Sequence, residues 1–217
     1  MSKIFREGQN WVIVDHINDL SLANEVCDDV TDTDWHQYTT AKGPKSRQHY
    51  LMNPRWMPVE DHREPARLDE LKARWKHIVQ NQVVNHGLMP ADWTELHPCS
   101  SWTVIGEEGS YHTIHEHGVS NICSVTYLKV PKGQEPPAGQ IFFVMHGEPY
   151  SPLATPQARI FHIQPHEGMI VIFPSWMLHG VYPQGPGTRQ TLNIDFNGDP
   201  NYNFRHKQAG GIGFNTY

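Results

Sequence analysis

The sequence predicts a mainly β protein, with a β sandwich, jelly roll or barrel in its second half and helices packed against it from the first half. Two observations support this fold class. After about Trp93, short β-rich runs alternate with Gly and Pro turns, which indicates about eight short strands. Before that point, apolar side chains recur at helical spacing within residues 65–86. The length of 217 residues favours a single domain over 1–217.

The first half, residues 1–95, is expected to be a mixed, partly helical support region. Trp11–Val14 is typical of a short buried strand, and a helix is expected near Leu20–Val30. Residues 31–60 are polar and contain proline, so no element is assigned there. The strongest helix prediction spans 65–86, with Pro65 in its first turn and Gly87 just past its end.

The second half, residues 96–200, is expected to form the β core, followed by a Gly-containing tail over 201–217. Turn residues separate the runs that favour strands. The expected strands are Ser101–Ile105, Tyr111–His117, Asn121–Val130, Gln140–Met145, Ile160–Ile163, Met169–Phe173, Leu178–Tyr182 and Thr188–Asn197.

Composition and charge exclude several functional classes. The net charge is −6 and no basic block is present, which argues against a nucleic-acid binder. The apolar runs are too short to span a membrane, and no signal peptide is visible at the N-terminus. The three cysteines are widely spaced and odd in number, so neither a disulfide framework nor a cysteine zinc site is expected. A cytoplasmic location is the simplest expectation.

The chain contains 15 histidines, and two of them have the spacing of metal ligands on a strand. Alternate strand residues share a face, so Thr113, His115 and His117 are predicted to point one way. Glu116 is predicted to point the opposite way. Two imidazoles at positions i and i+2 can hold one metal ion from the same side, although this pair is a weak signal by itself.

A second group of polar residues lies in the last predicted strand. There Arg189, Thr191, Asn193 and Asp195 share one face, and the alternate residues Leu192, Ile194 and Phe196 share the other. An arginine on a polar strand face can be a solvated charge. If it points into a barrel instead, it needs an anionic partner, and a carboxylate is the natural one.

These segments together resemble the Fe(II)- and 2-oxoglutarate-dependent oxygenases, in particular a subgroup of unknown substrate. The resemblance covers roughly Trp102 to Asn197, and it implies a double-stranded β-helix, which is a cupin-like jelly roll. The order and spacing of the motifs are specific jointly. The matching segments are Gly109-Ser-Tyr111, His115-Glu-His117, Gly168-Met-Ile-Val-Ile-Phe-Pro-Ser-Trp176, His179, Arg189-Gln-Thr191 and Phe196-Asn197.

The resemblance implies that His115 and His179 are iron ligands. His117 stands where most of the superfamily has Asp or Glu, so this chain departs from the usual two-histidine, one-carboxylate set. We therefore expect a three-histidine site of His115, His117 and His179. Glu116 is the alternative third ligand, although strand alternation points it away.

The resemblance also implies a site for 2-oxoglutarate as cosubstrate. Arg189, helped by Thr191, would bind its distal carboxylate, and Tyr127 is a further candidate that could equally be an ordinary core tyrosine. Asn193 and Asp195 face the same interior, where either a substrate-binding or a structural role is open. Trp176 could line the substrate entrance or simply pack.

The function that follows is a non-haem Fe(II) oxygenase that uses 2-oxoglutarate and O2 and releases succinate and CO2. Hydroxylation of a small molecule or a peptide is the outcome that the resemblance implies, and no catalytic side chain beyond the metal centre is assigned. Two alternatives stay open: a cupin-type metalloenzyme independent of 2-oxoglutarate, and a non-catalytic, metal-stabilised binding module. The sequence does not specify the oligomeric state.

Overall fold

The computed structural model describes residues 2–30, 36–37, 46–53, 62–118, 120–146 and 158–198. The predicted tail, 201–217, and much of the segment 31–60 lie outside these residues. The described elements are β1 (Lys3–Glu7), β2 (Asn10–His16), α1 (Ser21–Asp28), β3 (His36–Gln37), β4 (Ser46–Tyr50), α2 (Leu68–Asn85), β5 (His97–Gly106), β6 (His112–His115), β7 (Ile122–Lys129), β8 (Ile141–His146), β9 (Ala158–Ile163), β10 (Met169–Pro174), β11 (His179–Val181) and β12 (Arg189–Asn197).

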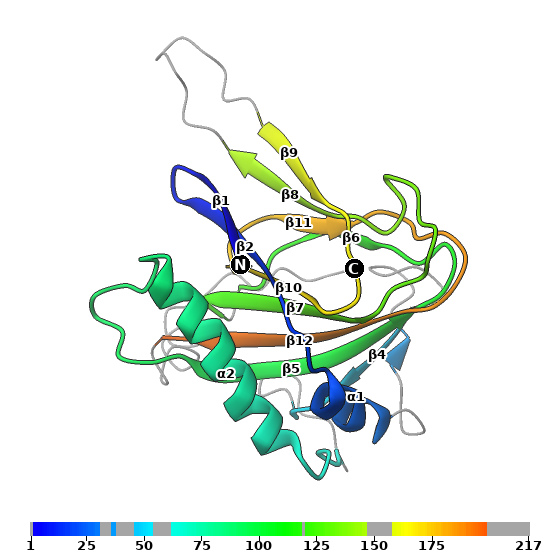
Figure 1. The fold of residues 1–217 in the computed structure, drawn as a ribbon, viewed down its shortest axis with the longest axis horizontal. Coiled ribbons are helices and arrows are strands. Elements are labelled where there is room, and N and C mark those ends of the chain that lie inside the picture. Colours follow the sequence, from blue (N-terminus) through cyan, green and yellow to red (C-terminus); the bar gives the residue numbers. More distant parts are fainter. Residues whose placement is uncertain are drawn as a thin grey trace.

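The strands form two sheets (Figure 1). The larger sheet has the order β1-β2-β10-β7-β12-β5-β4-β3, and the smaller one has the order β6-β11-β8-β9. All eight strands predicted after Trp93 are present as β5 to β12, with ends that differ by a few residues. The predicted mainly β fold class is therefore confirmed, with the strands of the second half divided between the two sheets as in a jelly roll.

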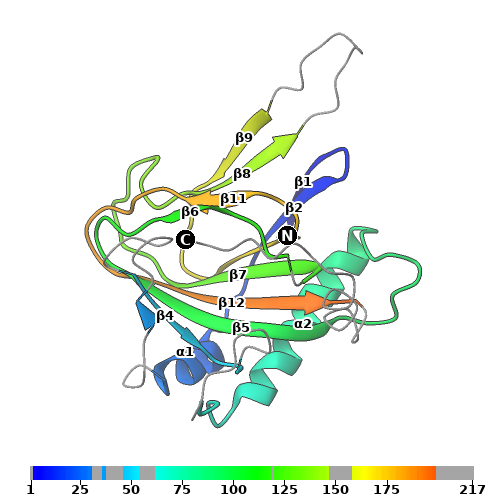
Figure 2. The same cartoon turned by 180° about the vertical axis from the view of Figure 1, so that it is seen from behind.

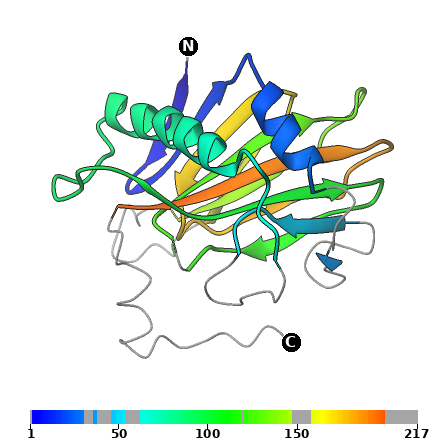
Figure 3. The same ribbon diagram turned by 90° about the horizontal axis from the view of Figure 1, so that it is seen from below.

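Both helices lie on one side of the larger sheet (Figure 3). The helix α2 buries Leu68, Leu71, Trp75, Val79 and Val83, which recur at helical spacing and join the core beneath α1 and the sheet. The indole Nε1–H of Trp75 donates to Thr126 Oγ1 on β7 at 2.9 Å, so the helix is anchored to the sheet as well as packed on it.

The ends of α2 refine the prediction. The helix begins at Leu68, and Pro65 lies in the preceding turn, where its carbonyl accepts a hydrogen bond from the Leu68 N–H at 3.2 Å. The prediction that Pro65 belongs to the first helical turn is therefore wrong. Gly87 has a φ of +64°, a left-handed conformation that favours glycine and ends the helix as predicted.

A second apolar core fills the space between the two sheets. Strand β10 shows how the cores are divided, because it is buried on both sides. Ile170 and Ile172 face the helices, whereas Met169, Val171 and Phe173 face the smaller sheet. This double burial explains why β10 is a continuous apolar run and not an alternating one.

The N-terminal region contributes strands as well as helices. The strand β2 pairs with β10, and β4 pairs with β5, so both extend the larger sheet on opposite sides (Figure 2). The prediction included β2 but missed β1, β3 and β4. Within the described residues, no helix is long and apolar enough to cross a membrane.

Candidate metal centre

Three histidines from the smaller sheet and its adjoining loop converge at one point. His115 ends β6, and His179 begins β11 directly opposite it in the antiparallel register. His117 lies two residues past β6, where its backbone N–H donates to the carbonyl of Ser175 at 3.0 Å. One ligating atom from each of these three side chains lies within 4.8 Å of the others. We call His115, His117 and His179 the histidine cluster.

The hydrogen bonds of His115 and His179 indicate which ring nitrogen carries the proton. His115 Nδ1 is 2.8 Å from the carbonyl oxygen of Thr113, and His179 Nδ1 is 2.9 Å from that of Met177. A carbonyl oxygen only accepts, so each of these rings carries its proton on Nδ1. Their Nε2 lone pairs are then available to bind a metal ion.

The environment of His179 keeps its ring neutral. The side chain is 4% exposed and lies against the rings of Phe143 and Phe173. Burial lowers its pKa well below the usual value, and the neighbouring His115 and His117 lower it further. A neutral imidazole is the form that ligates a metal ion.

His117 has a different partner from the other two histidines. Its Nδ1 lies 2.9 Å from Oδ2 of Asp195, a carboxylate on β12 that is 2% exposed. The same oxygen accepts a hydrogen bond from Ser120 Oγ at 3.3 Å, and Cys123 Sγ lies 3.2 Å from His117 Nδ1. His117, Cys123 and Asp195 therefore form a second group of ligating atoms beside the histidine cluster, sharing His117 with it.

The residues predicted to bind 2-oxoglutarate lie further along β12 and on the neighbouring strand β7. Thr191 on β12 pairs with Tyr127 on β7, and both side chains are buried. Arg189 is 7% exposed, and its one side-chain hydrogen bond in the described part of the chain goes from Nη1 to the carbonyl of Gly139 at 3.4 Å. No carboxylate of the described residues forms an ion pair with it.

Burial dominates the electrostatics of this group. It lowers the pKa of Arg189, whose charge is disfavoured away from water. It also raises the pKa of Tyr127 to about 12, although the nearby Arg189 charge acts in the opposite direction. A neutral phenol and a guanidinium that pairs with no carboxylate of the described residues thus lie together inside the β core, an arrangement suited to an incoming carboxylate.

Other predicted positions are less central. Glu116 is exposed and belongs to neither group of ligating side chains, as strand alternation predicted. Trp176 is 53% exposed, so it does not pack in the core. The sequence reasoning missed Trp102, whose ring centroid lies 5.5 Å from that of His117, and the thiol of Cys123. Only the placement of Cys123 on the same face as Tyr127 could have indicated its position.

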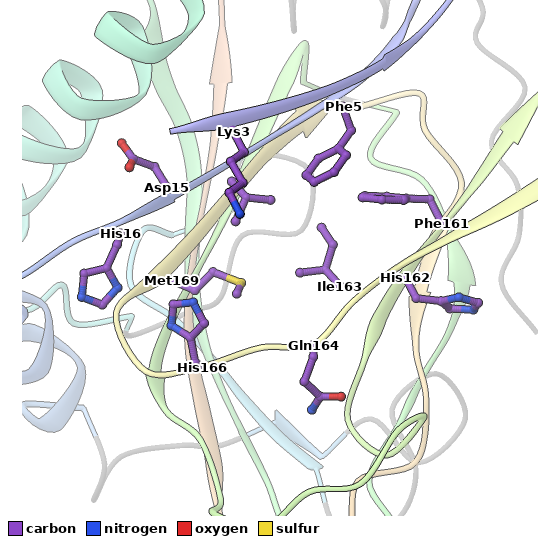
Figure 4. Close-up of a pocket in the computed structure, with 11 residues that line it drawn as sticks. Lys3, Phe5, Asp15, His16, Phe161, His162, Ile163, Gln164, His166 and Met169 are labelled. Carbon is purple, nitrogen blue, oxygen red and sulfur yellow. The ribbon is translucent and has the colours of Figure 1, made fainter. Parts of the chain in front are cut away.

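A separate cavity of about 480 Å³ lies between β1, β2 and β9. Figure 4 shows Phe5 and Phe161 beside each other on one side and His16 and His166 on the other. The ring centroids are 4.5 Å apart in the phenylalanine pair and 5.5 Å apart in the histidine pair. None of the three histidines of the cluster lines this cavity. Because its polar side chains do not converge on one point as metal ligands do, the histidine cluster is the stronger candidate site.

Comparison with known proteins agrees with the fold and with the family resemblance. Residues 100–197 match the family described as "Putative 2OG-Fe(II) oxygenase". No curated protein matches the chain.

Solved structures share the fold at low sequence identity. A prolyl-4-hydroxylase from Pseudomonas putida is 16% identical with a TM-score of 0.57, covering 86% of this chain and 91% of that one. A prolyl hydroxylase from Trichoplax adhaerens, in complex with a hypoxia inducible factor peptide fragment, is 12% identical with a TM-score of 0.58, covering 89% and 86%. HygX from Streptomyces hygroscopicus, with nickel and 2-oxoglutarate bound, is 10% identical with a TM-score of 0.54, covering 86% and 82%.

The family match covers the segment that contains the whole histidine cluster and Arg189, and the solved structures share the double-stranded β-helix in which this segment is folded. Over residues 100–197 the chain therefore matches the family of putative 2OG-Fe(II) oxygenases, within a fold that it shares with these solved structures.

Proposed function

We propose that this protein is a non-haem oxygenase in which His115, His117 and His179 hold Fe(II) and Arg189 binds 2-oxoglutarate. The donor set fits the metal, because imidazole nitrogen is a ligand that suits Fe(II) and the Nδ1 hydrogen bonds of His115 and His179 leave the ring lone pair on Nε2. Three protein nitrogens on one side of the metal also leave positions for other ligands, as an open catalytic site requires.

The single observation that carries the cosubstrate assignment is the buried Arg189 guanidinium, which has no carboxylate partner among the described residues. A buried, unpaired charge is costly, and a bidentate carboxylate is the partner that best offsets it. Arg189 and Asp195 lie at alternate positions of the same strand, so the guanidinium and the histidine cluster open onto one interior face. A ligand with a carboxylate at one end and a metal-chelating group at the other matches this arrangement.

When bound, Fe(II) and 2-oxoglutarate would supply the oxidation, in which O2 is consumed, 2-oxoglutarate is converted to succinate and CO2, and the substrate is hydroxylated. The protein residues position and shield these groups. Arg189 and Thr191 orient the distal carboxylate, and Tyr127 adds a neutral hydroxyl beside them. The rings of Phe143 and Phe173 keep water from one side of His179.

The substrate we propose is a small molecule or a peptide. Prolyl hydroxylases are among the structural neighbours, and one of these is bound to a peptide fragment. Near the metal site, Trp176 is 53% exposed, and its neighbours Ser175 and Met177 accept hydrogen bonds from His117 and His179, which leaves apolar surface close to the histidines for a substrate to contact.

Anaerobic addition of Fe(II) and then 2-oxoglutarate tests the proposal. We expect a weak visible charge-transfer band that needs both additions, and succinate formation once air and a substrate are admitted. A screen of small molecules and peptides by 2-oxoglutarate turnover would then identify the substrate. Absence of both the band and succinate would contradict the proposal, and metal-dependent turnover that ignores 2-oxoglutarate would favour a cupin-type enzyme.

A further inference from the structure

We propose that Asp195 is a positioning residue for the metal centre, which holds His117 with its proton on Nδ1 and its Nε2 toward the metal. It would also provide, one hydrogen bond away, the negative charge that a carboxylate ligand provides elsewhere in the superfamily. This inference rests on the proposed three-histidine metal site, and it concerns a residue whose role the sequence left open.

The contact itself is specific. Asp195 Oδ2 lies 2.9 Å from His117 Nδ1, and a carboxylate can only accept, so the imidazole donates. Strand β12 places Asp195 opposite Cys123 on β7, and the side chain is 2% exposed. A buried carboxylate in this position constrains the ring much more than a solvated one would, because it has few alternative partners.

The carboxylate is only partly satisfied by the residues that the structure describes. Its Oδ2 also accepts from Ser120 Oγ at 3.3 Å, whereas its Oδ1 is buried without a hydrogen-bond partner among them. Within the described residues, its one ion-pairing partner is His117. Folding alone does not account for a buried, half-satisfied carboxylate, whereas a functional site can.

Asp195 is also what distinguishes His117 from the other two histidines. His115 and His179 donate to neutral backbone carbonyls, whereas His117 donates to a charged group. Hydrogen bonds to a carboxylate are stronger and raise the basicity of a ligating imidazole. Asp195 thus supplies the negative charge that three neutral histidine ligands lack, through its hydrogen bond to the histidine that stands in place of the carboxylate.

The second group of ligating atoms offers a competing arrangement. His117 Nδ1, Cys123 Sγ and Asp195 could themselves hold a metal ion, with the thiol as thiolate. In that arrangement His117 would turn Nδ1 to the metal, and Asp195 would be a ligand. The two arrangements differ in the histidine nitrogen used and in whether sulfur binds the metal.

The first experiment compares the Co(II) affinity of three proteins by competition with a chelator. Asp195→Asn removes the charge at nearly constant shape and should weaken Co(II) binding about 10- to 100-fold. Ser124→Ala is the matched control, because Ser124 is an equally buried strand residue that donates to the Ile194 carbonyl on the helix-facing side. The control should retain the wild-type affinity, and Asp195→Asn within about twofold of wild type would overturn the inference.

The second experiment uses the wild-type protein, so it does not depend on whether a variant folds. Long-range ¹H–¹⁵N NMR of the Zn(II)-loaded protein should find the His117 proton on Nδ1, and the Co(II) spectrum should lack a thiolate-to-metal absorption. Metal on His117 Nδ1, or a thiolate band, would overturn the positioning role. If the wild type binds no metal at all, the proposed function fails together with this inference, whereas unchanged binding by Asp195→Asn refutes the inference alone.

Discussion

Replacing Arg189 with Met removes the buried guanidinium while keeping most of the aliphatic side chain. In the ligand-free protein the charge is compensated by one long hydrogen bond to the Gly139 carbonyl and by no carboxylate of the described residues. The variant should therefore be more stable than the wild type without ligands and should bind 2-oxoglutarate much more weakly. These two effects have opposite signs, which separates them from a general loss of structure.

The magnitudes follow from the burial of the group. Losing one partner of a buried charge pair costs about 2–5 kcal/mol in binding. At about 1.4 kcal/mol per tenfold, this predicts a rise in the Kd for 2-oxoglutarate from about 30-fold to several thousand-fold. Replacing buried charge by apolar volume stabilises proteins by about 1–4 kcal/mol in favourable cases, and in a chain of this size each kcal/mol shifts Tm by about 2–4 °C.

The assay is a titration of the Fe(II)-loaded proteins without oxygen, using 2-oxoglutarate and 2-oxobutyrate. The second compound has the same chelating end but lacks the distal carboxylate, so its affinity should be nearly equal in wild type and Arg189→Met. The Fe(II) affinity should also change by less than about threefold. Wild-type affinity of the variant for 2-oxoglutarate, or an equal loss for both compounds, would refute the assigned role of Arg189.

Three further predictions concern other parts of the molecule. Glu116→Gln should leave the Co(II) affinity unchanged, because Glu116 is exposed and lies outside both groups of ligating atoms, whereas His117→Ala should reduce that affinity. If a chelator competition found equal losses of affinity for the two variants, Glu116 would again be a candidate ligand. Trp75→Phe should lower the free energy of unfolding, measured in urea, by about 1–3 kcal/mol, because the buried Thr126 hydroxyl loses its hydrogen-bond partner. The variant should keep the wild-type metal affinity, and a loss of metal binding would contradict the prediction that this contact acts on stability alone. Burial raises the pKa of Cys27 to about 12, so as the pH rises the thiol of the unfolded chain ionises before that of the folded protein, and the free energy of unfolding should decline between pH 9 and 12. Urea titrations should show a smaller decline for Cys27→Ala, and the same decline in both proteins would contradict a contribution from Cys27.

Local patterns predicted much of the fold because each reports a short-range periodicity. The helix α2 followed from Leu68, Leu71 and Trp75 at helical spacing, and β12 followed from the alternation of polar and apolar residues around Leu192 and Asn193. The strands β1, β3 and β4 were missed because β1 is mostly exposed and because β3 and β4 fall in the polar segment without a clear period. Their strand conformation depends on pairing: β1 pairs with β2, β4 pairs with β5, which is distant in the sequence, and the edge strand β3 pairs with β4.

The sequence by itself determined which side chains share a face, and therefore that His115 and His117 are potential partners and that Arg189 and Asp195 look into the same interior. It could not determine what those side chains meet there. Only the tertiary structure brings His179 opposite His115, leaves Arg189 without a carboxylate partner among the described residues, and places Asp195 against His117 across 78 positions of the chain. The physical reason is that periodicity fixes the direction of a side chain within its own strand, whereas its partner is decided by how separate strands pair and how the two sheets face each other.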